Sequence, residues 1–402
     1  MFLLFEGALR KWFLPGLSNG LLIIRDPIVL YIYYLALQQG INPIQNKYIK
    51  FLLNLTIVST VLSVIVGGHP LTIVYGLRTN FLHFPLIFVM GQFLTKEDVI
   101  SFGKAFLILA LPMTWVVAEQ FQADRFDQIN VAAGGTGHQM MTSGDKVRAS
   151  GTFTFVSGIV FYYCFAIAFI IYGFIVRNTF PKWMLYFGTS ATFLAMVTSG
   201  SRSLIAESLQ VFACLGFLAY LKPQAFGRIT VTAFILAGLA FFLYSQVTLF
   251  KDGLDFLSLR FEEAANVEGN PVTAYFIRYW EIISAPFGSI RFDSVNGIFG
   301  HGLGSGTRAG AALGRGFGFE LDWARQIFES GAFIGVTFIV WRFWICRDLL
   351  TACLNGVRRN SYLPIFLWGA SAPVILVGIL GQPTNLGFAA FGGGLCLAAC
   401  KR

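Results

Sequence analysis

The sequence predicts an all-helical, polytopic membrane protein with about eleven membrane-spanning helices. Hydrophobic residues make up 56% of its 402 positions and charged residues only 12%, whereas a soluble domain carries roughly 25% charged residues. The apolar residues come in continuous runs of about 20, the length that crosses a bilayer as a helix, and not in the alternating pattern of a membrane barrel. The 43 glycines and 43 phenylalanines suit close-packed helices, because small residues let backbones approach and aromatic rings fill the gaps.

The apolar segments place the spans in chain order. We expect them near 21–38, 51–67, 81–94, 99–120, 153–176, 183–200, 203–221, 229–248, 327–346, 361–381 and 384–400. The third is short for a bilayer, and the first carries the charged pair Arg25 and Asp26, which is costly in lipid. Residues 1–402 are thus expected to form a single integral membrane domain, within which 249–326 is a large extracytoplasmic loop carrying short helices.

The basic residues set the orientation of these spans. Alternating the spans brings twelve of them to one face, which the positive-inside rule makes cytoplasmic: Lys47, Lys50, Lys96, Arg177, Lys182, Lys222, Arg228, Arg347, Arg358, Arg359, Lys401 and Arg402. The connections 68–80, 121–152 and 249–326 then lie outside, together with the short turn at 200–203. We therefore expect the chemistry on the extracytoplasmic side.

The same alternation places the N-terminus outside. Residues 1–20 contain Glu6, Arg10 and Lys11 and lack the order of a signal peptide. One hypothesis is that an upstream helix is missing, which would give about twelve spans with both termini inside. The alternative is that 1–18 is an interfacial or re-entrant segment.

Several classes of function find no support in the sequence. The formal net charge of +9 comes from inner-loop residues that the topology already explains, so nucleic acid is not an expected partner. The four histidines are scattered without ligand spacing, and no metal or other cofactor is expected. The run 302–306, Gly-Leu-Gly-Ser-Gly, lacks the lysine of a phosphate-binding P-loop.

The outer segment 249–326 carries most of the polar residues. Its apolar and aromatic part predicts a helix over 272–285 that lies on or dips into the outer membrane surface. On that helix Arg278 and Glu281 share a face, and Trp280 is placed to sit at the headgroup level or to stack on a sugar ring. The alternative is an interfacial helix with an exposed ion pair.

Two further groups in this segment are candidates for a site. The run from Gly300 to Thr307 offers backbone amides to a phosphate through His301, Gly302 and Gly304, or it is a plain turn. At the entry to the ninth span, one helix face can present Asp322, Arg325 and Glu329. Ionisable groups at the rim of a spanning helix are functional candidates; the alternative is an acidic cluster that offsets the helix dipole.

The turn Thr198-Ser199-Gly200-Ser201-Arg202-Ser203 joins two spans by almost no loop. It places Arg202 at the outer mouth between them. A planar, permanently charged guanidinium is what a diphosphate site requires. Snorkelling to the interface also explains a single arginine, but less economically when Arg202, Arg278 and Arg325 fall on one face.

These residues resemble the bacterial O-antigen polymerase and O-antigen ligase superfamily of lipid-linked glycan transferases. The resemblance rests on short motifs spread over most of the chain: the 199–203 turn, the outer loop with Arg278 and Trp280, the 300–306 run, the segment 329–335 and the opening 5–12 followed by Arg25-Asp26-Pro27.

The resemblance implies a metal-independent glycosyltransferase of the bacterial inner membrane. It would use an undecaprenyl-diphosphate-linked glycan as donor at the extracytoplasmic face, in exopolysaccharide or O-antigen synthesis. The acceptor would be a glycan or a lipid. Membrane lipids and a chain-length regulator are the further candidate partners. By position, Arg202 and Arg278 match the arginines that are proposed to hold the diphosphate.

The chain also departs from the ligase branch, which carries a histidine just before the last long outer-facing span. This chain reads Phe319-Glu320-Leu321-Asp322-Trp323-Ala324-Arg325 there. Glu320 or Asp322 could take the proton of the acceptor hydroxyl, or Arg325 could contact phosphate. This departure favours a polymerase-like member. The catalytic candidates are Arg202, Arg278, Glu320, Asp322 and Arg325, and the substrate-binding candidates are Arg78, Trp280, His301, Gly302, Gly304 and Glu329.

Two functions from other classes remain as alternatives. A transporter or flippase of lipid-linked glycan has a similar number of helices, although no internal repeat relates the halves and the polar groups gather at one surface instead of the midplane. A non-catalytic scaffold of envelope assembly would predict that single arginine changes are silent.

Overall fold

The chain folds into a bundle of helices in the computed structural model. The structure describes residues 2–401 except 136, 140–145, 289, 291, 293 and 313–317, and it leaves undescribed the side chains of 225–226, 267–268, 271–272, 274–276, 278–279, 309 and 312. The described part contains no β-strand, only the isolated bridge between Val131 and His138.

The helices follow the apolar segments closely. In the first half they are α1 (Phe2–Ala8), α2 (Ser18–Leu21), α3 (Arg25–Gln38), α4 (Lys47–Ile65), α5 (Pro70–Leu77), α6 (Pro85–Phe93), α7 (Lys96–Gln122), α8 (Val156–Ile175) and α9 (Lys182–Thr198). In the second half they are α10 (Arg202–Leu221), α11 (Phe226–Gln246), α12 (Thr248–Glu268), α13 (Pro271–Gly288), α14 (Val295–Phe299), α15 (Arg308–Ala312), α16 (Asp322–Arg358), α17 (Leu363–Leu376) and α18 (Pro383–Ala399). Short 3-10 turns (Pro15–Leu17, Gln128–Asn130, Pro223–Ala225) and π-helical turns (Leu9–Phe13, Arg78–Leu82) link them.

Local chemistry explains where several helices begin. Asn46 accepts a hydrogen bond from the Tyr48 amide at 2.9 Å and caps α4. Thr95 and Asp98 exchange hydrogen bonds as a capping box at the start of α7, the arrangement that satisfies otherwise orphaned amides. Proline stands at the beginning of α5, α6, α17 and α18, where its missing amide costs nothing.

Within the described residues, seven helical segments are long and apolar enough to cross a membrane. They are Pro15–Gln38, Lys47–Ile65, Pro70–Phe93, Lys96–Gln122, Val156–Ile175, Arg202–Leu221 and Gly227–Gln246. A helical membrane protein is thereby supported, whereas the count of eleven stays a prediction, because α9, α17 and α18 are shorter and α16 carries more charge. The third expected span was placed too late: its helical run begins at Pro70, within the segment 68–80 that the sequence assigned to an outer connection.

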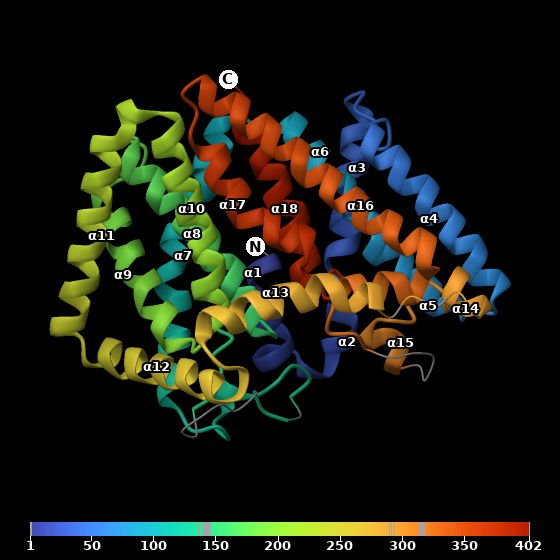
Figure 1. Ribbon diagram of the computed structural model, residues 1–402, viewed down its shortest axis with the longest axis horizontal. Helices are drawn as coiled ribbons and strands as arrows, with labels where there is room; N and C mark the ends of the chain where they lie inside the picture. Colours follow the sequence, from blue (N-terminus) through green and yellow to red (C-terminus); the bar gives the residue numbers. More distant parts are fainter. Residues whose placement is uncertain are drawn as a thin grey trace.

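The connections gather at the two ends of the bundle (Figure 1). α12 and α13 lie across one end, on the same side as the 121–152 connection and α15, while the turns after α3, α10 and α16 lie at the opposite end near the C-terminus. The helix α13 confirms the one expected over 272–285. Which of the two ends faces the cytoplasm stays a prediction from the basic residues.

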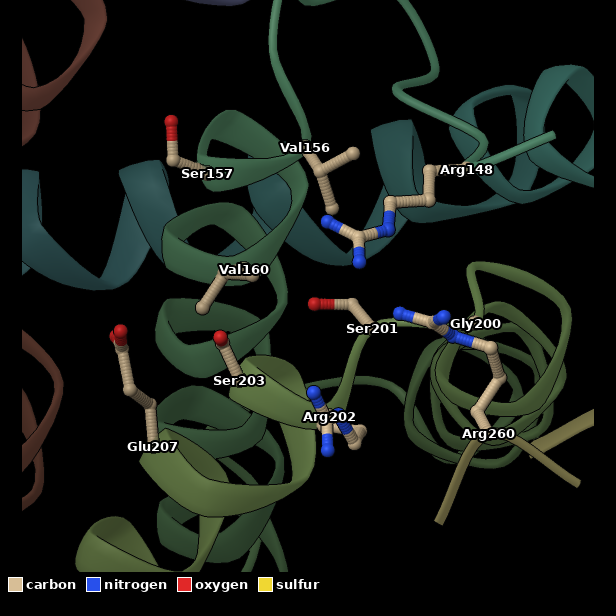
Figure 2. Close-up of a pocket in the computed structure, with 10 residues that line it drawn as sticks. All are labelled: Arg148, Val156, Ser157, Val160, Gly200, Ser201, Arg202, Ser203, Glu207 and Arg260. Atoms are coloured by element: carbon tan, nitrogen blue, oxygen red, sulfur yellow. The ribbon is translucent and has the colours of Figure 1, made fainter. Parts of the chain in front are cut away.

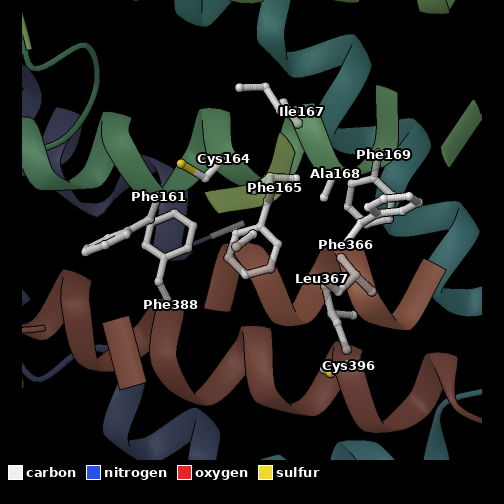
Figure 3. Packing of buried hydrophobic residues seen from close by; sticks show 14 of the residues in the cluster. Phe161, Cys164, Phe165, Ile167, Ala168, Phe169, Phe366, Leu367, Phe388 and Cys396 are labelled. Carbon is white, nitrogen blue, oxygen red and sulfur yellow. The ribbon is translucent and has the colours of Figure 1, made fainter. Parts of the chain in front are cut away.

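α8 forms the centre of the bundle. Nearly all of its side chains are buried, as expected for a helix that is apolar on every face. Its Phe161 and Phe165 pack on Phe388 of α18, with the Phe165 and Phe388 rings stacked at 6.0 Å (Figure 3). α17 contacts α8, α10 and α16, so α8 and α10 pack on a shared core.

The N-terminal segment is folded into the protein. Leu4 belongs to the main apolar core, and the Thr152 hydroxyl donates to the Leu4 carbonyl at 2.6 Å. A Cβ on Gly7 would lie 2.4 Å from the Thr152 carbonyl oxygen, so only glycine permits this approach. This packing ties the N-terminal segment to the end of the 121–152 connection.

Candidate functional site

The short turn between α9 and α10 positions Arg202. Gly200 has φ of 59°, and a Cβ at this position would lie 2.3 Å from Cε1 of Phe256, so glycine is required both for the backbone and for the packing. The Ser201 hydroxyl accepts from the Leu204 amide at 3.4 Å and caps α10. Arg202 is therefore fixed in the first turn of a 20-residue helix.

A cavity of about 210 Å³ opens at this turn (Figure 2). It is lined by Arg148, Val156, Ser157, Val160, Gly200, Ser201, Arg202, Ser203, Glu207 and Arg260. The lining comes from the 121–152 connection, the turn between α9 and α10, the first two turns of α8 and of α10, and α12. Three segments that are distant in sequence thus each supply one guanidinium.

The charge around the cavity is unevenly distributed. The guanidiniums of Arg148, Arg202 and Arg260 lie on one side in Figure 2 and the carboxyl group of Glu207 on the other. Arg260 also pairs with Glu263 on α12 at 3.8 Å. The positive end of the α10 dipole faces the same turn, and a helix N-terminus combined with guanidiniums favours phosphate groups. The cavity is therefore suited to a compact, multiply charged anion.

A second, larger cavity adjoins the first. Its volume is about 500 Å³, and it is lined by Phe121, Gln122, Lys146, Thr248, Leu249, Asp252 and Phe256. Phe256 packs on Gly200 of the first cavity and on Phe121, with the two rings 5.4 Å apart. Aromatic faces beside amide, hydroxyl and carboxyl groups are suited to polar organic ligands such as sugars.

Lys11 anchors the connection that carries Arg148. Its Nζ donates to the Gly151 carbonyl at 2.6 Å and to the Ser150 hydroxyl at 3.1 Å, and the side chain is buried. Burial lowers the pKa of Lys11 to about 7, far below the roughly 10.4 of a free lysine.

Fold stability should therefore rise with pH above 7. Because the folded state favours the neutral amine, the unfolded chain binds more protons between pH 7 and about 10.4, so the free energy of unfolding increases with pH across that window. The unfolding midpoint of the wild type, measured in detergent, should rise between pH 7 and 9. In Lys11→Met this rise should be smaller. An identical slope for wild type and Lys11→Met would contradict the assignment.

Asp322, Arg325 and Glu329, which the sequence places on one helix face, form a buried ion network. Arg325 donates to Asp322 at 2.8 Å and to Glu329 at 2.9 Å, and Arg342 pairs with Asp322 at 3.0 Å. The Asn80 side-chain oxygen accepts from Arg325 at 3.3 Å. All four charged side chains are at most 2% exposed, and none lines the cavity of Arg202. The three predicted residues do come together, but in the interior and not at the anion cavity.

The run from Gly300 to Thr307 packs on this network, and several of its backbone amides bond to the protein instead of facing a phosphate. The amides of His301 and Gly302 donate to the carbonyls of Phe328 and Glu329 at 2.9 and 3.0 Å, and the Gly306 amide donates to the Glu329 carboxylate at 3.2 Å. Gly304, with φ of 80°, packs so closely on α5 that a Cβ would lie 2.1 Å from the Thr72 carbonyl oxygen. The His301 ring is exposed and stacks on Phe328 at 4.0 Å.

Arg78 lies in another buried ion network. It occupies the π-helical turn between α5 and α6, pairs with Asp26 and donates to the Leu22 carbonyl at 2.8 Å. Arg25, next to Asp26, pairs with Glu6 at 3.0 Å. The Glu6–Arg25 pair therefore joins the motifs at 5–12 and 25–27 in space, and Arg78 holds Asp26 of the second motif.

The remaining sequence candidates lie on the surface or outside the described side chains. Trp280 on α13 is 67% exposed, and Glu320 is exposed just before α16. Arg278 belongs to α13, but its side chain lies outside the described residues. Neither Trp280 nor Glu320 is among the described residues that line the two cavities.

Sequence reasoning missed Arg148, Arg260 and Glu207. Arg148 stands in a connection without helical pattern, and Arg260 appears in the sequence as one charge among many in a nearly balanced loop. Glu207 carried a stronger signal, because an acidic residue five positions into a spanning helix is costly in lipid and marks a functional candidate.

No protein-family model matches the chain, and no curated protein matches it significantly. The assignment of function therefore depends on the two cavities and the residues that line them.

Proposed function

We propose that this protein is a membrane glycosyltransferase that transfers or polymerises glycan units from an undecaprenyl-diphosphate-linked donor at the extracytoplasmic face of a bacterial inner membrane. The observation that carries the proposal is the convergence of Arg148, Arg202 and Arg260 on one cavity beside the N-terminus of α10. Such a site matches a diphosphate, whose charge is offset by guanidiniums and helix amides together.

The reaction follows from the chemistry of this donor. The bond between the sugar C1 and the diphosphate oxygen breaks, a bond between C1 and an acceptor hydroxyl oxygen forms, and undecaprenyl diphosphate leaves with the electron pair. Negative charge grows on the leaving oxygen in the transition state, and preorganised guanidiniums stabilise it there. The adjoining cavity of about 500 Å³ is the proposed place of the glycan, stacked against Phe121 and Phe256.

A reconstituted assay tests this function. Purified protein in liposomes is supplied with the undecaprenyl-diphosphate-linked glycan that accumulates in a deletion strain of the source organism, and products are resolved by length on a gel. A ladder of longer glycans is expected for a polymerase, and a single addition to another acceptor indicates ligase-type transfer. Movement of the donor across the bilayer without any transfer would instead identify a transporter.

A further inference from the structure

The anion cavity contains an acidic group that the donor site does not require. Glu207 lines the cavity with Arg202, five residues further along α10, which places it about 7.5 Å deeper along the helix axis. Its Oε2 is buried and has no hydrogen-bond partner among the described residues, and the same holds for the hydroxyl of Ser157 in the wall formed by α8. A buried carboxyl oxygen is unfavourable without a hydrogen-bond partner, so this end of the cavity is suited to a ligand hydroxyl.

Transfer of a glycan to a hydroxyl also releases a proton. Among the residues that line the cavity, arginine remains protonated and only donates, and serine is too weak a base to accept a proton near neutral pH. Among the described residues of that lining, Glu207 is the one carboxylate and none is a histidine. Asp322, a candidate from the sequence, pairs with Arg325 and Arg342 elsewhere.

We propose that Glu207 is the general base of the transfer, and that the acceptor hydroxyl binds between Glu207 and the sugar C1. This inference rests on the proposed function. In the step, the Glu207 carboxylate takes the proton of the acceptor hydroxyl while the acceptor oxygen bonds to C1 and the diphosphate departs toward Arg148, Arg202 and Arg260. Glu207 and the three arginines line the same cavity, and Figure 2 shows the carboxyl group set apart from the guanidiniums; the reacting carbon is proposed to bind between them.

The experiment separates binding from transfer. Undecaprenyl diphosphate, the leaving group itself, is titrated onto detergent-purified wild type, Glu207→Gln and Arg202→Ala, and transfer is measured with the accumulated lipid-linked glycan. Glu207→Gln keeps the shape of the side chain, so we expect unchanged binding but transfer reduced by about 10² to 10⁴-fold, the usual contribution of a general base.

Formate should partly restore transfer to Glu207→Ala by replacing the missing carboxylate. Glu119→Gln, at a half-buried carboxyl of α7 outside both cavities, is the matched control and should transfer normally.

Each other outcome overturns the inference in a recognisable way. If Glu207→Gln transfers glycan normally while Arg202→Ala is inactive, Glu207 is not the general base. The proposed function is then unaffected. Glu207→Gln that loses binding together with transfer assigns the carboxyl group to the fold or to donor binding. If the wild type transfers no glycan, both the proposed function and the role of Glu207 as general base are rejected.

Discussion

Arg202→Ala should lower glycan transfer by at least about 100-fold while the amount of folded protein stays unchanged. The side chain is only partly buried and lies in the first turn of α10, so its loss leaves the packing of the helix intact. The same loss removes a planar donor from the place where charge develops on the leaving diphosphate. The reconstituted transfer assay, with protein quantified by size-exclusion chromatography, measures both effects.

Two variants give this prediction its control. Arg202→Lys should recover little activity, because an ammonium group supplies a point charge and not the paired donors of a guanidinium. Arg177→Ala, at an exposed arginine of the turn after α8, should behave as wild type. Full activity of Arg202→Ala would remove the cavity from the mechanism and favour the scaffold alternative.

The partners of Arg202 can be tested in the same assay. The sequence paired it with Arg278, whereas the cavity pairs it with Arg148 and Arg260. Arg148→Ala and Arg260→Ala should each impair binding of undecaprenyl diphosphate as well as transfer. If Arg260→Ala is active while Arg278→Ala is inactive, the diphosphate contact belongs to Arg278, as the sequence proposed, and not to Arg260.

The fold was largely predictable because the length and continuity of an apolar run are local properties of the sequence. Each expected span falls on a helix, and the helix over 272–285 was found from its aromatic and apolar residues. The error at the third span has a physical cause. Polar residues such as Arg78 and Asn80 interrupt the apolar run but are buried against partners from other helices, and only the tertiary structure supplies those partners.

The candidate site was predictable only in part. Arg202 was recognised because a turn of almost no length fixed its place between two helices. Asp322, Arg325 and Glu329 were correctly grouped by helical spacing, but spacing does not say which face of a helix meets the core. The places of Arg148 and Arg260 depend on how two long connections fold back over one end of the bundle, which no local pattern encodes.

Asp322→Ala should destabilise the fold by about 3–5 kcal/mol, the usual consequence of breaking a buried ion pair from one side. The change would leave Arg342 without its ion partner and Arg325 with Glu329 alone, all at 2% exposure or less. We expect a strongly lowered unfolding midpoint in detergent and a poor yield of monodisperse protein. An unchanged midpoint would show that the network contributes little to stability.

A charge-balanced double variant decides whether this destabilisation hides a catalytic role. In Asp322→Asn combined with Arg342→Met, one negative and one positive charge disappear together, so Arg325 and Glu329 remain as a paired couple. Removing a buried pair as a unit is often neutral or even stabilising, and most of the lost midpoint should return. Transfer should return with it if the network only supports the fold. A double variant that is stable but inactive would instead restore Asp322 as a catalytic candidate and would contradict the separation between the buried network and the arginine cavity.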